Sequence, residues 1–165
     1  MLNPQLAPAL TTALSPRHRE GRTVLLGVGS ELRSDDAAGI RVAERVEALG
    51  LPGLRALAGG PSPENLTGQI RELSPSRLII VDAADMGLPP GTIRLLNPDE
   101  IEGMSFSTHT LPLSVVADYL RKETGCSLLI MGIQPRSLEF DGAMSPEIAA
   151  AVEEAVQAIA SCFST

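Results

Sequence analysis

Short runs of apolar residues that alternate with helical patterns constrain this fold most strongly. Residues 23–28 (TVLLGV) and 77–82 (RLIIVD) each contain an unbroken run of apolar residues, without polar alternation. Such runs are typical of strands buried on both faces of a parallel sheet. Further strands are expected at 54–58, 92–96 and 127–133, and helices at 38–50, 64–73, 111–125 and 145–163. The order predicts an α/β fold of three layers: a doubly wound, mostly parallel sheet with helices on both faces.

The length of 165 residues suits one domain with one core. Residues 1–20 are interrupted by Pro4, Pro8 and Pro16, which predicts a flexible N-terminal extension. Residues 21–165 are then expected to form a single α/β domain. The extension lacks the basic start and continuous apolar stretch of a signal peptide, and no run is long enough for a membrane helix.

Charge and cysteine content narrow the partners and the compartment. The formal net charge of −7 disfavours nucleic acid, because phosphate contacts supply most of that affinity. Cys126 and Cys162 are too few and too far apart for a disulfide framework or a zinc knuckle, and both are expected to be buried thiols. A cytoplasmic location is therefore expected.

The loop after residue 28 partly resembles a dinucleotide-binding loop. Gly27 and Gly29 match its first two glycines, but Leu32 occupies the third position. Asp35 and Asp36 stand where a pyrophosphate would meet the helix N-terminus, and two anions repel each other there. A nucleotide-binding regulator is kept only as a third hypothesis, and either aspartate could simply favour the helix start.

Three residues are candidates for a site at the carboxyl edge of the sheet. Asp36 follows the first strand, Asp82 ends the clearest apolar strand, and His109 lies in a loop of small hydroxyl residues. Parallel α/β sheets bind ligands at this edge. By contrast, Asp85 is expected to be an ordinary loop residue, and His18, in the N-terminal extension, is expected to be inert.

Two carboxylates and one imidazole suit a borderline divalent metal ion. Such a ligand set leaves coordination positions open for a substrate or a reactive water. A Ser-His-Asp hydrolase is less favoured, because no serine lies in a nucleophile-elbow sequence.

Several stretches of the chain resemble the hydrogenase maturation endopeptidases, in particular those of the formate-linked, hydrogenase-3-like (group 4) type. These stretches are residues 26–36 (LGVGSELRSDD), 59–65 (GGPSPEN), 70–82 (IRELSPSRLIIVD), 85–88 (DMGL), 107–109 (STH) and 129–135 (LIMGIQP). Their order and spacing extend over nearly all of the expected folded chain. The positions that match the family's metal-contacting residues are Asp36, Asp82 and His109.

The resemblance implies an endopeptidase, often classed as aspartic-type, that removes the C-terminal extension of a nickel–iron hydrogenase large-subunit precursor after nickel insertion. The metal implied is the nickel of that precursor, and zinc or cadmium is expected to replace it in crystals. The three residues are expected to serve as both metal-contacting and catalytic groups. The implied partner is the precursor, and the enzyme is expected to be a monomer. A non-catalytic chaperone that binds the nickel-loaded precursor is the alternative.

Three positions depart from the usual family pattern. Ser30 replaces Asn, Ala37 replaces Gly, and Ala58 replaces an Asp before the glycine pair. These changes could alter loop shape or substrate docking, but all three expected site residues are retained.

Overall fold

The computed structural model describes residues 3–14, 21–101, 104–106 and 111–164. Within them the strands are β1 (Thr23–Val28), β2 (Leu54–Gly60), β3 (Arg77–Asp85), β4 (Ile93–Leu96), β5 (Ser105–Phe106) and β6 (Ser127–Ile133). The α-helices are α1 (Leu6–Ala13), α2 (Ala38–Ala48), α3 (Thr67–Leu73), α4 (Leu113–Thr124) and α5 (Pro146–Phe163). Three short 3-10 helices, η2 (Ser34–Ala37), η3 (Pro63–Leu66) and η4 (Pro98–Glu100), complete the described elements.

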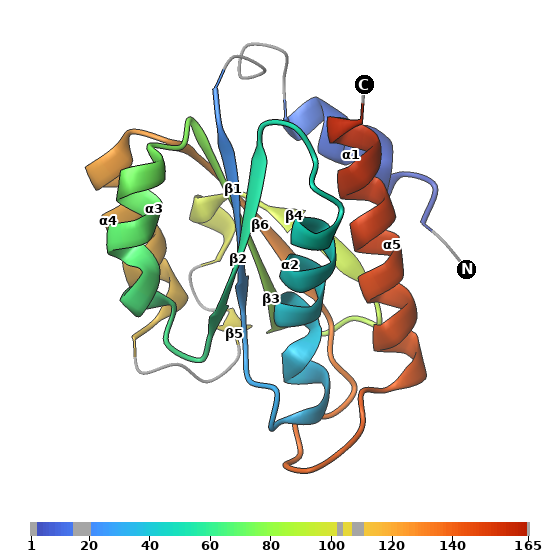
Figure 1. Ribbon diagram of the computed structural model, residues 1–165. Coiled ribbons are helices and arrows are strands. Elements are labelled where there is room, and N and C mark those ends of the chain that lie inside the picture. Colours follow the sequence, from blue (N-terminus) through green and yellow to red (C-terminus); the bar gives the residue numbers. More distant parts are fainter. Residues whose placement is uncertain (1–2, 15–20, 102–103, 107–110, 165) are drawn as a thin grey trace.

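The main sheet has the strand order β2-β1-β3-β6-β4 (Figure 1). Strands β2, β1, β3 and β6 are parallel, whereas β4 pairs antiparallel to β6 at one edge. The short strand β5 pairs antiparallel with the end of β3. This mostly parallel, doubly wound arrangement confirms the predicted fold class.

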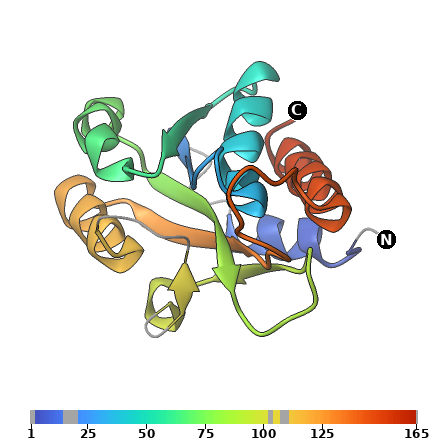
Figure 2. The same ribbon diagram turned by 90° about the horizontal axis from the view of Figure 1, so that it is seen from below.

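Helices cover both faces of the sheet, as the view along the sheet shows (Figure 2). Helices α1, α2 and α5 lie on one face, and α3 and α4 lie on the other. Consecutive residues of β3 therefore contribute to different cores: Ile79 and Val81 pack under α2 and α5, whereas Leu78 and Ile80 pack under α3 and α4. Burial on both faces explains why the strand sequence shows no polar alternation.

Part of the N-terminal segment is helical where a flexible extension was expected. Residues 6–13 form helix α1, whose Leu6 and Leu10 are buried against α5 and β4. Pro8 does not prevent this helix, because the first-turn N–H groups of a helix have no intrahelical partners to lose. Leu6 and Leu10 lie one turn apart on the same face, and their packing favours the helix although the prolines predicted an irregular extension. Residues 1–2 and 15–20, which include His18, lie outside the described residues.

The central strand is longer than its apolar run. Strand β3 continues through Asp82 to Asp85, so the prediction that Asp82 ends the strand is wrong. The extra residues are held by pairing: Ala84 opposes Phe106, and Asp85 opposes Ser105 of β5. Pairing with β5, which is distant in the sequence, therefore continues the strand beyond the end of its apolar run.

The remaining expectations concern the thiols and the membrane. Cys126 is buried as expected, but Cys162 is only half-buried, with its sulfur 3.4 Å from the hydroxyl of Thr11. Both cysteines are free thiols. No helix in the described part of the chain has the length and apolar character needed to cross a bilayer.

Candidate active site

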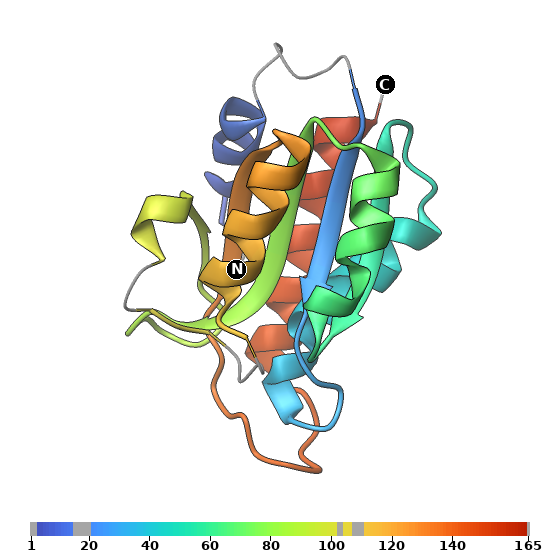
Figure 3. The same ribbon diagram turned by 90° about the vertical axis from the view of Figure 1, so that its left-hand side faces the viewer.

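The carboxyl ends of β1 and β3 lie side by side in the middle of the sheet (Figure 3). From β1 the chain passes through α2 to β2 on one side, and after β3 it passes through α4 to β6 on the other. Helices α2 and α4 cover opposite faces of the sheet (Figure 2). Open α/β sheets bind ligands at such a change of direction, beyond the carboxyl ends of the strands. The fold therefore favours a site between β1 and β3.

Asp82 lies at this position. It is one residue beyond Val81, the last β3 residue that pairs with β1, and it is 0% exposed. Because side chains alternate along a strand, Asp82 shares the face of Ile80, which is covered by α3 and α4. Removing a carboxylate from water is costly unless polar or charged groups compensate it. Its burial at the sheet edge favours a functional role over a purely structural one.

Asp36 reaches the same edge from the other strand. It lies in η2, between β1 and α2, and is 1% exposed. Its backbone carbonyl accepts a hydrogen bond from the N–H of Ser30 at 3.2 Å, and its own N–H donates to the carbonyl of Arg33 at 2.9 Å. The loop thus closes on itself around Asp36.

Two glycines make this close packing sterically feasible. Gly29 has φ +142°, and a Cβ there would lie 1.8 Å from the carbonyl oxygen of Asp36. At Gly39 a Cβ would lie 2.3 Å from the carbonyl oxygen of Val81 and 2.5 Å from that of Val28. The start of α2 therefore sits directly against the ends of β1 and β3. In a dinucleotide-binding loop the third glycine allows the helix to pack closely on the strand, and Leu32 occupies that position here. In this chain Gly39 allows the close packing instead.

Positive charge is present on the Asp36 side of the site. Arg33 Nη1 lies 3.8 Å from Asp36 Oδ2, and the guanidinium is partly exposed whereas the carboxylate is buried. Asp36 also stands just before the N-terminus of α2, where the helix dipole favours negative charge. Arg33 and the start of α2 therefore bring positive charge to the Asp36 side of the site.

Two of the three predicted site residues are thus described, and they come from adjoining elements, since η2 contacts β3. His109, the third, lies outside the described residues. The nearest described strand before it is β5, where Phe106 pairs with Ala84, two residues beyond Asp82. Among the described residues alone, no group of three or more His, Cys, Asp or Glu side chains is placed to hold a metal ion.

Asp35, next in sequence to Asp36, has a different task. Its buried carboxylate accepts hydrogen bonds from the N–H groups of Arg136 (2.9 Å), Ser137 (3.0 Å) and Ser145 (2.7 Å), and from the Ser145 hydroxyl (2.8 Å). Asp35 therefore fastens the β6–α5 loop to the β1–α2 loop instead of capping a helix. The sequence shows the acidic pair, but it does not show that Asp35, and not Asp36, binds the β6–α5 loop.

A second contact joins the two ends of the β6–α5 loop. Arg136 donates a hydrogen bond to Glu147 Oε1 at 2.6 Å, and this bond is the main reason that the pKa of Glu147 is lowered. Because the pKa is lower in the folded state, the pair stabilises the fold above the unfolded-state pKa, and that contribution is lost as the pH falls through the folded-state value. Both side chains are exposed, so the contribution is small.

Gln134 holds the loop that follows β3, a role that sequence reasoning missed. Its Oε1 accepts hydrogen bonds from the N–H groups of Met86 (2.6 Å) and Leu88 (3.3 Å), and its Nε2 donates to Asp85 Oδ1 at 3.3 Å. Asp85, expected in a loop, is instead the exposed last residue of β3. Gln134 lies in residues 129–135, one of the stretches that resemble the hydrogenase maturation endopeptidases. That resemblance was the only sequence feature that pointed to a role for Gln134.

Replacing Gln134 with Ala is expected to lower the free energy of unfolding by about 1–2 kcal/mol, because partly buried N–H groups lose their acceptor. The midpoint of thermal unfolding should fall by about 5 °C. Gln157→Ala is the matched control, since its exposed amide donates to Glu153 on the surface of α5. Equal melting temperatures for the two variants would contradict the role given to Gln134.

The three departures from the family pattern leave Asp36 and Asp82 in place. The hydroxyl of Ser30 accepts a hydrogen bond from the N–H of Leu32 at 3.2 Å and so stabilises the turn. Ala37 is buried in η2, and Ala58 is exposed on the edge strand β2. None of these positions interrupts the elements that carry the two aspartates.

Comparison with known proteins agrees with this architecture. The family model described as HycI, hydrogenase maturation protease, matches residues 40–162, a span that includes Asp82 and His109 and begins after Asp36. The chain is 43% identical over 135 residues to the hydrogenase 3 maturation protease of Escherichia coli K12, covering 81% of this chain and 86% of that protein. It is 35% identical over 127 residues to a putative hydrogenase maturation protease of Methanocaldococcus jannaschii, covering 72% and 75% of the two chains.

Solved structures show the same relationship. The crystal structure of the [NiFe] hydrogenase maturation protease HycI from Thermococcus kodakarensis superimposes with a TM-score of 0.85 at 32% identity, covering 95% of this chain and 99% of that one. Sequence and structure therefore agree on the class of protein: the chain is a peptidase. It belongs to the hydrogenase maturation protease family.

Proposed function

We propose that this peptidase removes the C-terminal extension of a nickel–iron hydrogenase large-subunit precursor once nickel has been inserted. The observation that carries the proposal is the pair of buried carboxylates, Asp36 and Asp82, on adjoining elements at the change of direction between β1 and β3. Family membership supports a polypeptide substrate from hydrogenase maturation. The two free thiols fit a reducing compartment, and we propose the cytoplasm.

In this proposal Asp36, Asp82 and His109 contact the nickel already bound in the precursor. Carboxylate and imidazole groups suit a borderline divalent ion, and the nickel belongs to the substrate. Contact with the metal would hold the neighbouring peptide bond beside a carboxylate base or a metal-polarised water. Correct positioning alone lowers the barrier of such a reaction substantially.

The alternatives separate cleanly in one experiment. The purified protein is mixed with nickel-loaded or nickel-free precursor, and the C-terminus of the large subunit is measured by mass spectrometry. We expect shortening of the loaded precursor and a rate about 100-fold lower without nickel, because the scissile bond is then not positioned. A chaperone would bind the loaded precursor without shortening it. A nucleotide-binding regulator would show a thermal shift with ATP or NAD and none with divalent metal.

An equal rate on both precursors would overturn nickel recognition while leaving the peptidase assignment intact. The oligomeric state is measured in the same samples by light scattering, where we expect a monomer.

A further inference from the structure

Two large apolar side chains are displayed beside the site. Leu32 is 65% exposed and Phe140 is 70% exposed, more than any other large apolar residue in the described part of the chain. They lie on neighbouring loops, because the N–H of Asp141 donates to the carbonyl of Leu32 at 3.1 Å. Single exposed apolar residues are common, but a pair at the edge of a candidate active site indicates a binding surface.

The loops that carry these side chains are firmly built. The Ser34 hydroxyl donates to the carbonyl of Glu139 at 2.6 Å, next to the hydrogen bonds of Asp35. Ser34 and Asp141 adopt left-handed backbone conformations, with φ of 49° and 59°. Such conformations are unfavourable for residues other than glycine and persist only where the surroundings enforce them. The exposure of Leu32 and Phe140 is therefore a property of the folded loops.

The pair is also continuous with the site. The Cζ atom of Arg33 lies 5.9 Å from the centroid of the Phe140 ring, within reach of a cation–π contact. The same guanidinium lies 3.8 Å from Asp36 Oδ2. Leu32 precedes Asp36 by four residues in one loop. We name Leu32 and Phe140 the apolar rim, and the guanidinium of Arg33 adjoins it.

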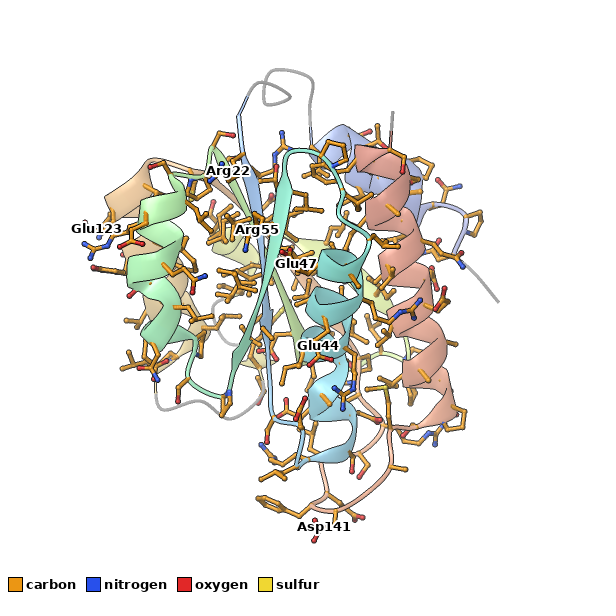
Figure 4. The ribbon with its side chains drawn as sticks, in the orientation of Figure 1. Arg22, Glu44, Glu47, Arg55, Glu123 and Asp141 are labelled. Atoms are coloured by element: carbon orange, nitrogen blue, oxygen red, sulfur yellow. The ribbon has the colours of Figure 1, made fainter. Side chains whose placement is uncertain are left out.

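Charges around the rim limit what it can bind. Glu139 and Asp141 flank Phe140 and are exposed, and Asp141 lies at the tip of the loop, beyond the start of α2 (Figure 4). The net charge of the chain is −7. An acidic segment would be repelled here, whereas an apolar side chain with neutral or basic neighbours would not.

We infer that the apolar rim binds an apolar side chain of the precursor polypeptide, in a segment free of acidic residues, and so helps to seat the cleaved segment against Asp36. The inference rests on the proposed function, because it assigns a substrate contact to the same site. Burial of one or two apolar side chains contributes mainly to binding, so the rim acts on substrate affinity and leaves the chemical step to the buried carboxylates.

The test compares Leu32→Ser, Phe140→Ser and the double variant with the wild type in cleavage kinetics across a range of nickel-loaded precursor concentrations. We expect KM to rise about tenfold in each single variant and further in the double variant, with kcat within about twofold of wild type. Phe140→Leu, which stays apolar, should restore most of the affinity. Leu49→Ser is the matched control: this leucine is 51% exposed at the opposite end of α2.

Each outcome bears on one claim. No shortening of the precursor by the wild type would refute the proposed function itself. If the wild type shortens the precursor but the double variant has an unchanged KM, the inference that the rim binds the precursor is wrong. A double variant that changes its oligomeric state at unchanged KM would assign the rim to contact between copies of this chain, which also overturns the inference. Circular dichroism of every variant confirms that the fold is retained.

Discussion

Asp36→Asn and Asp82→Asn are each expected to slow processing of a nickel-loaded precursor by at least about 100-fold, the lower range for loss of a positioned acid–base group. Asparagine keeps the size of the side chain and one acceptor oxygen. It lacks the negative charge that would bind nickel or take up a proton. Both aspartates are buried, Asp36 in η2 and Asp82 in β3, so water alone is not expected to replace the lost carboxylate.

The measurement is the rate of appearance of the shortened large subunit by mass spectrometry, with a thermal melt of each variant to show that it is folded. Asp118→Asn is the matched control, because Asp118 lies on the surface of α4, paired with Lys122. His109→Ala belongs in the same series as a test of the third predicted residue. Full processing by all three site variants would remove the site assignment.

Asp35→Asn is expected to be the most destabilising single change at the sheet edge. The carboxylate accepts four hydrogen bonds from three residues of the β6–α5 loop. An amide would turn its NH₂ group toward backbone donors, leaving buried N–H groups without an acceptor. The expected loss is about 3–5 kcal/mol of unfolding free energy, comparable to breaking a buried charged interaction. The unfolding midpoint should fall by about 10 °C.

Asp141→Asn provides the control for this change. Asp141 is exposed at the tip of the loop that Asp35 fastens (Figure 4), and asparagine tolerates its left-handed conformation. A melting temperature close to wild type is expected for this variant. If Asp35→Asn melts at the same temperature as Asp141→Asn, the two loops are held by something other than Asp35.

The two adjacent aspartates illustrate how far sequence reasoning reaches. Local pattern suggested that either Asp35 or Asp36 could favour the helix start while the other faced the site. The structure assigns Asp35 to the loop that contains Ser145, more than 100 residues away. No residue near Asp35 in the sequence indicates that Ser145 will be its partner. The contact forms only when β6 and α2 are packed together.

Helix α1 and Gln134 were missed for a related reason. The leucines of α1 form a stripe only two turns long, which is too short to outweigh prolines until α5 provides a surface for it. Gln134 is an ordinary polar residue until its side chain meets the N–H groups of Met86 and Leu88.

The sequence alone determined the α/β class and the positions of the central strands, because consecutive apolar residues have few ways to leave water other than a covered parallel sheet. Family-like stretches also indicated the peptidase class. Only the tertiary structure decided that η2, which carries Asp36, contacts β3 while Asp35 ties two loops. It also decided that residues 6–13 join the core and that Leu32 and Phe140 are exposed side by side. These features depend on contacts between segments far apart in the chain. Such contacts stabilise the protein only after the helices have packed on the sheet.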